Sequence, residues 1–267
     1  MKSDIDERQL LEQAGAALGG VRLGLKGVIR GDARLPRYVV RCTVEQPSAE
    51  LPATVIVKRA NWPGWALAER IALEFLNALP VVAGHGLVPR LLGHNQEHEL
   101  LVVEDLGDNR LSVILHHADA GQARKALLET VRTLATIHAA TMGQEALHKE
   151  ISTRIAPRRT WGTMDRDLNS PLESFPKQVA SVGLSLGVGA AQDLKDILAV
   201  LNQDGPFRGF IQGDLNPGNI LERDGRGCLC DFVPSAYYNV FHRGGLPPDL
   251  LSCSRGYPTV SHGIPRT

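Results

Sequence analysis

The chain has 267 residues, of which 43% are hydrophobic, so it is long enough to bury a sizeable core in one large domain or in two lobes. Lysine plus arginine and aspartate plus glutamate both number 29, and a net charge of zero argues against a nucleic-acid-binding or basic membrane-binding surface. No apolar run approaches the ~20 residues of a membrane span, and the charged N-terminus lacks the apolar segment of a signal peptide. We therefore expect a cytoplasmic protein without nucleic-acid or membrane partners.

The first hundred residues contain two helical patterns and several β-rich runs. Apolar residues at helical spacing predict helices from Ile5 to Leu18 and from about Ala66 to Leu79. The predicted strands are Val21–Leu25, Arg37–Val44, Leu51–Arg59, Leu87–Gly93 and Glu99–Val103. Together they predict a five-stranded antiparallel sheet.

From Leu111 onward the pattern changes to helices. Ala120 to Thr141 has a long apolar face, and Gln192 to Leu201 forms another helical segment. Residues 143 to 175 have no clear period. His138, near the end of the long helical segment, is best interpreted as a packed structural histidine. A mainly helical second lobe is therefore expected.

The stretch from Phe210 to Phe232 carries most of the chemistry, because two apolar runs flank a loop rich in Gly, Pro, Asn and Asp. Asp214 and Asn219 have the D-x-x-x-x-N spacing of a kinase catalytic loop, in which Asp accepts a hydroxyl proton and Asn binds magnesium. Asp231 closes the next apolar run, where a second magnesium ligand would fall. Such hard oxygen ligands suit a cation that bridges phosphates. A plain turn between strands is the alternative interpretation of the loop alone.

Lys58 ends the β-branched run V-I-V-K. A lysine at this place resembles the third-strand lysine of kinases, which contacts nucleotide phosphates and pairs with a helix glutamate. A solvated charge at a strand end is the alternative. Glu69 and Glu74 in the next helix are the two candidate partners, and Glu74 is preferred, with an exposed helix charge as the alternative for either.

The segments G-D-L-N-P-G-N-I-L and C-L-C-D-F resemble the G-D-x-x-P-x-N and I-D-F elements of the aminoglycoside phosphotransferase and choline kinase family. These are small-molecule kinases with a protein-kinase-like fold. The resemblance implies that Asp214 is the catalytic base and that Asn219 and Asp231 are magnesium ligands. The segment E-D-L-G-D resembles the family's hinge, where main-chain groups near Glu104 and Leu106 would bind adenine.

Several features depart from the family pattern. The family usually has His before the Gly and often His two residues after the Asp, whereas this chain has Gln212 and Asn216; Val233 stands where an acidic residue is common. From about Leu250 the chain shows little helical periodicity, although relatives generally continue with helices that wall the acceptor site. A compact subfamily and a truncated or frame-altered chain both fit this ending.

We therefore predict an α+β, two-lobed protein-kinase-like fold, with an N-terminal antiparallel sheet lobe over residues 1–104 and a mainly helical lobe over residues 105–267. The predicted reaction transfers the γ-phosphoryl group of ATP, with Mg²⁺, to a hydroxyl of a small-molecule acceptor. The alternatives are a catalytically inactive, nucleotide-binding pseudokinase and a regulatory interaction protein. A phosphodiester hydrolase is less favoured because Lys58 would have no role. The identity of the acceptor and the oligomeric state stay open.

Overall fold

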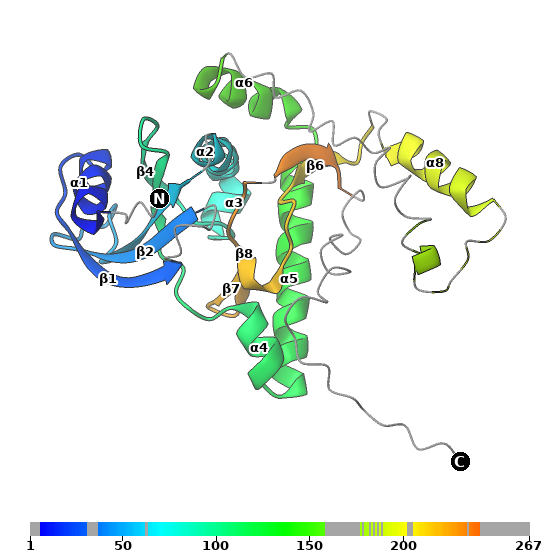
Figure 1. Ribbon diagram of the computed structural model, residues 1–267, viewed down its shortest axis with the longest axis horizontal. Helices are drawn as coiled ribbons and strands as arrows, with labels where there is room; N and C mark the ends of the chain where they lie inside the picture. The colour runs from blue at the N-terminus through cyan, green and yellow to red at the C-terminus, as the bar shows by residue number, and fades with distance from the viewer. Residues whose placement is uncertain are drawn as a thin grey trace.

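The computed structural model describes residues 6–30, 37–61, 64–157, 189–201, 205–233 and 235–240, together with scattered positions between 177 and 187. Its N-terminal part is a five-stranded antiparallel sheet in the order β1-β2-β3-β5-β4. The strands are β1 (Leu23–Arg30), β2 (Arg37–Val44), β3 (Thr54–Ala60), β4 (Leu91–Asn95) and β5 (Leu100–Glu104). The predicted α+β fold with an antiparallel sheet is therefore confirmed (Figure 1).

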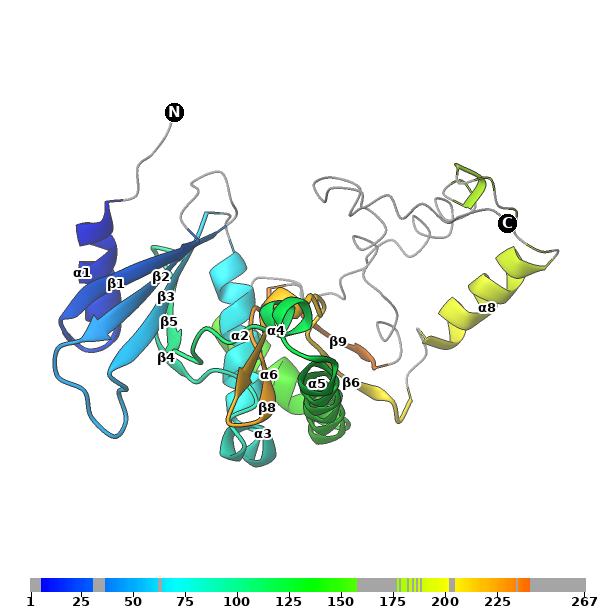
Figure 2. The same cartoon turned by 90° about the horizontal axis from the view of Figure 1, so that it is seen from below.

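Two helices sandwich this sheet. The helix α1 (Glu7–Ala17) lies on one face and α2 (Trp65–Asn77) on the other, as Figure 2 shows, and the short α3 (Pro80–Gly84) follows α2. Because side chains alternate along a strand, Val55 and Val57 pack towards α1 and Ile56 packs towards α2. Lys58, two residues after Ile56, consequently lies on the α2 face.

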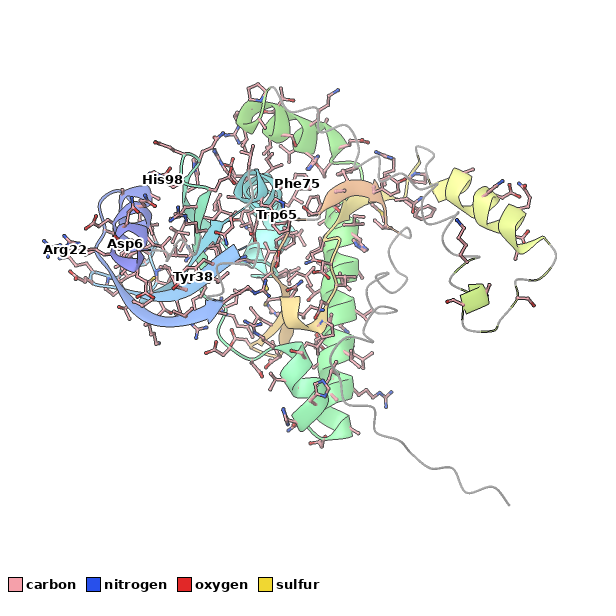
Figure 3. The ribbon with its side chains drawn as sticks, in the orientation of Figure 1. Asp6, Arg22, Tyr38, Trp65, Phe75 and His98 are labelled. Atoms are coloured by element: carbon pink, nitrogen blue, oxygen red, sulfur yellow. The ribbon has the colours of Figure 1, made fainter. Side chains whose placement is uncertain are left out.

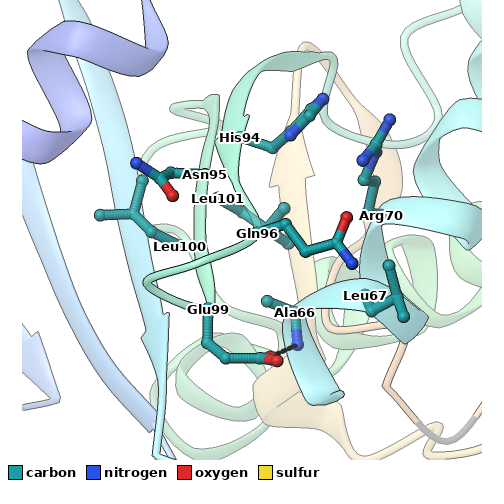
Figure 4. A pocket seen from close by; sticks show the side chains of 9 residues that line it. All are labelled: Ala66, Leu67, Arg70, His94, Asn95, Gln96, Glu99, Leu100 and Leu101. Atoms are coloured by element: carbon teal, nitrogen blue, oxygen red, sulfur yellow. Dashed lines mark hydrogen bonds between the residues drawn. The ribbon is translucent and has the colours of Figure 1, made fainter. Parts of the chain in front are cut away.

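The N-terminus of α2 is capped from a distant part of the chain. Its own N-cap residue, Gly64, has no side chain to accept the free backbone N–H groups. Glu99, in the turn between β4 and β5, accepts a hydrogen bond from the backbone N–H of Gly64 at 2.8 Å. It accepts a second one from the backbone N–H of Ala66 at 3.2 Å (Figure 4). A carboxylate at this end also complements the positive end of the helix dipole. The cap fixes the helix against the sheet edge and thus sets the position of the glutamates it carries.

The C-terminal part is built around one long helix. It contains α4 (Leu111–His117), α5 (Ala120–Thr141), α6 (Glu145–Ile155) and α8 (Ala190–Leu201), and the 3₁₀ turn Pro217–Asn219. Two antiparallel pairs complete it: β6 (Arg208–Ile211) with β9 (Ala236–Asn239), and β7 (Ile220–Arg223) with β8 (Arg226–Leu229). The helix α5 packs against β6 and β8.

The contact between α5 and β8 requires a glycine. A Cβ atom at Gly227 would lie 2.9 Å from the Cα of Thr130, closer than side-chain carbons approach. The absence of a side chain at Gly227 therefore lets the hairpin that ends at Leu229 lie directly on the helix, just before Asp231. The predicted division into lobes at residues 104 and 105 remains a prediction, and β5 ends at Glu104.

Among the described residues, no helix combines the length and apolar character needed to cross a membrane. The larger of the two apolar clusters contains residues of α2, of strands β3 and β5, of α5 and α6, and of the C-terminal strands. The two halves of the chain therefore share one core beneath the candidate site.

A cluster of aromatic rings joins α2, α6 and the β6–β9 pair at this shared core. Phe75, labelled on α2 in Figure 3, has its ring 5.1 Å from that of His148 on α6 and 5.5 Å from that of Phe210 on β6. The ring of Tyr237 on β9 lies 5.6 Å from that of His148. Burial lowers the pKa of His148 to about 4, against a smaller opposing effect of the Glu145 charge. The imidazole is therefore held neutral in the folded protein.

Replacing His148 with phenylalanine should change how stability depends on pH. Below its ordinary pKa the histidine takes up a proton in the unfolded chain but not in the folded one, so the wild type loses stability as the pH falls from about 6.5 to about 4. The loss is worth about 3 kcal/mol. Urea unfolding at pH 7 and pH 4 gives the free energy of unfolding at each pH. The decrease in this free energy from pH 7 to pH 4 should be smaller by that amount in His148→Phe than in the wild type. Equal differences in both proteins would contradict the assignment.

Candidate active site

The candidate catalytic carboxylate follows β6 and is held by an asparagine five residues later. Gly213 takes a backbone φ of 87°, a left-handed conformation that glycine adopts without strain, and Asp214 follows it. The Asn219 side chain donates from Nδ2 to Oδ2 of Asp214 at 2.9 Å and to its main-chain oxygen at 3.2 Å. The predicted D-x-x-x-x-N pair is therefore one hydrogen-bonded unit in the structure.

The second acidic segment lies beside this unit. The backbone N–H of Cys230 donates to the main-chain oxygen of Asn219 at 2.9 Å, which brings Asp231 next to the Asp214–Asn219 pair. Asp231 has φ of 66°, a conformation that is uncommon for a residue with a side chain.

The donor set of these residues fits a magnesium ion. Asn219 uses its Nδ2 on Asp214, so its amide oxygen Oδ1 is turned to the other side and keeps its lone pairs for another group. Together with Asp231 it offers two oxygen ligands. Within the described parts of the chain, no group of three or more His, Cys, Asp or Glu side chains could hold a metal ion. Partial coordination is what Mg²⁺ accepts, because it commonly keeps waters and substrate phosphates as its other ligands.

Lys58 forms a buried ion pair on the α2 face of the sheet. Its Nζ lies 2.5 Å from Oε1 of Glu69, and the side chains are 10% and 2% exposed. Burial alone would lower the Lys58 pKa, but the charges of Glu69 and Asp231 and the hydrogen bond with Glu69 raise it overall. Lys58 is therefore held as a cation beside Glu69, and its charge also interacts favourably with that of Asp231.

The predicted pairing of Lys58 with Glu74 is wrong. Glu74 instead binds Arg70 on its own helix and Arg154 on α6, each at 2.7 Å. Burial would raise the Glu74 pKa, but the hydrogen bonds from the two arginines lower it below its usual value. Five residues in an α-helix correspond to a rotation of about 140°, so Glu69 and Glu74 point in different directions. Only Glu69 faces the sheet.

A cleft with a volume of about 530 Å³ opens beside Lys58. Glu104 and Leu106, the two residues of the predicted hinge, line it, and so does Cys230. The Glu104 carboxylate is bound by Arg223 at 2.8 Å and Arg90 at 3.4 Å, so this side chain is already engaged within the protein.

A further residue holds the hinge and was not anticipated from the sequence. Arg41 on β2 donates to the carboxylates of Asp105 and Asp108, at 3.0 and 2.5 Å, and to the main-chain oxygen of Gly107 at 3.0 Å. A lone arginine within a strand carries no sequence signal for this contact. Its effect is to tie the segment after β5 to the sheet, so that one wall of the cleft is fixed.

The sheet, the hinge-like segment and the two acidic loops around one cleft define a protein-kinase-like fold. Residues 28–242 match the model of the phosphotransferase enzyme family, and the chain belongs to that family. Membership of this family supports a kinase-type enzyme.

The chain is similar to several solved structures at low sequence identity. The streptomycin–ATP complex of APH(2″)-IIa is 12% identical, with a TM-score of 0.50, and the match covers 90% of this chain and 74% of that one. Macrolide 2′-phosphotransferase MphH from Brachybacterium faecium is 16% identical, with a TM-score of 0.46 and coverage of 93% and 78%. An ethanolamine kinase from Plasmodium vivax is 11% identical, with a TM-score of 0.47, and the match covers 82% of this chain and 58% of that one. No curated protein sequence matches the chain.

Proposed function

We propose that the protein transfers the γ-phosphoryl group of ATP to a hydroxyl group of a small molecule, with Mg²⁺ as the cofactor. The observation that carries this proposal is the hydrogen-bonded pair Asp214–Asn219, with the Asp231 segment bound to it through Cys230. Gly218 and Cys230, the chain neighbours of Asn219 and Asp231, line the same cleft as Lys58. Membership of the phosphotransferase enzyme family supports the same reaction class. APH(2″)-IIa, which shares the fold, has been crystallised with streptomycin and ATP, so aminoglycosides are the first acceptors to test.

Each residue has one role in this proposal. Asp214 orients the acceptor hydroxyl and takes its proton as the acceptor oxygen bonds to the γ-phosphorus and the bond to the ADP oxygen breaks. Asn219 Oδ1 and Asp231 hold Mg²⁺, which neutralises charge on the phosphates. Lys58, held by Glu69, binds the phosphates.

The nucleotide base is assigned to the hinge side of the cleft. Main-chain groups near Glu104 and Leu106 would bind adenine there, because Leu106 is buried against the cleft and the Glu104 carboxylate is already engaged by arginines. Catalysis of this kind depends on positioning and electrostatic stabilisation more than on covalent chemistry.

The proposal predicts magnesium-dependent binding of ATP. A ligand that binds only the folded state at 100 times its Kd adds about 2.7 kcal/mol to the free energy of unfolding. ATP with Mg²⁺ should therefore raise the Tm clearly, whereas ATP with EDTA should raise it only weakly. In Asp231→Ala, the magnesium-dependent part of the Tm increase should be lost, and the smaller increase seen with ATP and EDTA should remain.

Turnover distinguishes the enzyme from its alternatives. A coupled ADP-release assay with a panel of aminoglycosides, amino alcohols, sugars and macrolides should find an acceptor that accelerates ADP formation. Mg-ATP binding without turnover on any acceptor would favour a pseudokinase. Equal protection by ATP in EDTA and in Mg²⁺ would contradict the assigned metal site.

A further inference from the structure

Gln212 lies between the two acidic segments and binds both. Its Nε2 donates to the main-chain oxygens of Cys230 at 3.0 Å and of Asp231 at 2.6 Å. Its Oε1 accepts from the backbone N–H of Asp214 at 2.7 Å. One side chain, only 4% of whose residue surface is exposed, thus connects the proposed catalytic residue with a proposed metal ligand.

These contacts close a circuit of hydrogen bonds. Asp214 is bound by the side chain of Asn219, whose main-chain oxygen accepts from the N–H of Cys230, and Gln212 joins Cys230 and Asp231 back to Asp214. Asp214, Asn219 and Asp231 have proposed chemical roles, and Cys230 contributes its main chain and its Sγ, which donates to the main-chain oxygen of Asn219 at 3.3 Å. Gln212 has no proposed chemical role, and its side chain binds main-chain groups of both Asp214 and Asp231. Its replacement therefore tests the connection between the two segments.

A primary amide suits this place because it offers two N–H donors and an acceptor in one plane. The donors meet two carbonyl oxygens on one segment while the acceptor meets an N–H on the other. A carboxylate of the same shape would keep the acceptor but turn an oxygen towards both carbonyl oxygens. A leucine of similar size would leave all three main-chain groups without their side-chain partner, which is costly at a buried site.

We propose that Gln212 is a positioning residue that holds the Asp214 and Asp231 segments in one fixed register. This inference rests on the proposed function, since it assigns the acceptor hydroxyl to Asp214 and the metal to Asp231. Groups that orient metal ligands from behind typically affect metal affinity or activity by about 10- to 100-fold when they are replaced. A Gln212 variant keeps the carboxylates of Asp214 and Asp231. It should nevertheless need a higher Mg²⁺ concentration for ATP to stabilise it.

The first arm of the test uses the full-length protein without ligand. Hydrogen exchange of the Cys230 amide, which donates to Asn219 rather than to Gln212, reports on the second segment independently. In Gln212→Leu this amide should exchange faster together with that of Asp214. In Gln212→Glu the Asp214 amide keeps its acceptor, so the faster exchange should concentrate at Cys230.

The second arm measures the Mg²⁺ concentration at which ATP stabilisation is half complete. That midpoint should rise about 10- to 100-fold in Gln212→Leu and Gln212→Glu. Gln212→His, whose ring offers one donor and one acceptor, should recover most of the response at pH 8. With an acceptor in hand, kcat should fall more than the KM for the acceptor rises.

Asn77 provides a matched control. Its amide also donates to a main-chain oxygen, that of Pro89, and accepts from a backbone N–H, that of Leu91, but it joins α2 to β4 away from the acidic segments. Asn77→Leu should lower the Tm without moving the Mg²⁺ midpoint. Equal midpoints in wild type and Gln212→Leu, or unchanged exchange at Cys230, would overturn the proposal. If Mg-ATP does not stabilise the wild type, the proposed function is contradicted instead. Hydrogen exchange at Cys230 then still tests whether Gln212 holds the two segments together.

Discussion

Lys58→Met should destabilise the protein by about 3–5 kcal/mol, because it leaves Glu69 as a buried carboxylate without its cation. The double variant Lys58→Met/Glu69→Leu should recover most of this loss, since it removes both buried charges and keeps the side-chain volume. Urea unfolding of the wild type, the two single variants and the double variant gives the coupling energy directly. The double variant should nevertheless stay defective in ATP binding, because the phosphate-binding cation is gone.

Glu74→Gln is the control for this cycle. Its partner Arg154 is 59% exposed, and an ion pair at the surface is worth about 1 kcal/mol or less, whereas Arg70 and Glu74 are only 15% and 20% exposed. We expect a small stability change and an unaltered ATP affinity, whereas Glu69→Gln should weaken both. An equal loss of ATP affinity in the two glutamate variants would contradict the observed pairing.

The choice between Glu69 and Glu74 could not be made from the sequence pattern of the helix. The helix α2 packs against the sheet on one side and near α6 on another, so it is buried over most of its circumference. Its apolar residues therefore predict a helix but do not indicate which face meets Lys58. That information comes from the cap by Glu99, which sets the helix rotation through a contact 33 and 35 residues away in sequence.

The secondary structure was predictable where a regular apolar pattern runs along a segment, even in α5, where Thr130, Thr133 and Thr141 supply much of the buried face. The helix Ala120–Thr141 has the predicted bounds, and all five predicted strands exist. The strand predicted from Leu87 begins only at Leu91, where the N–H is bound by the Asn77 side chain. The helix α6 was missed because His148 and Ser152 share its inward side with Ile151, which obscures the period. The predictions for the chain beyond about Leu250 lie outside the described residues.

The site loops were predictable because the reaction places close constraints on residue type and spacing. Asp214, Asn219 and Asp231 are separated by short, fixed distances along the chain and meet in the structure as expected. Their assigned roles stay predictions. Gln212 could be noted only as a departure from the family pattern, since its partners, the main-chain groups of residues 214, 230 and 231, carry no sequence signature.

Asp214→Asn should lower kcat and kcat/KM together by ~100-fold to ~10,000-fold, the usual effect of removing a general base. The amide oxygen of the new asparagine can still accept from Nδ2 of Asn219, which now binds Asp214 at 2.9 Å, so the loop should keep its shape. ATP affinity should stay nearly unchanged, because the proposed nucleotide and metal contacts lie on Lys58, Asn219 and Asp231. The measurement is ADP release with the best acceptor beside an ATP titration of each protein.

The same substitution at Asp224 is the matched control for Asp214→Asn. Asp224 lies in the turn between β7 and β8 with a side chain that is 89% exposed, and its φ of 52° is one that asparagine also tolerates. Asp224→Asn should therefore turn over at the wild-type rate. If Asp214→Asn does so too, Asp214 does not take the proton. A large loss at 214 with ATP affinity preserved places this carboxylate at the acceptor hydroxyl, since a residue needed only for folding or nucleotide binding would change the titration as well.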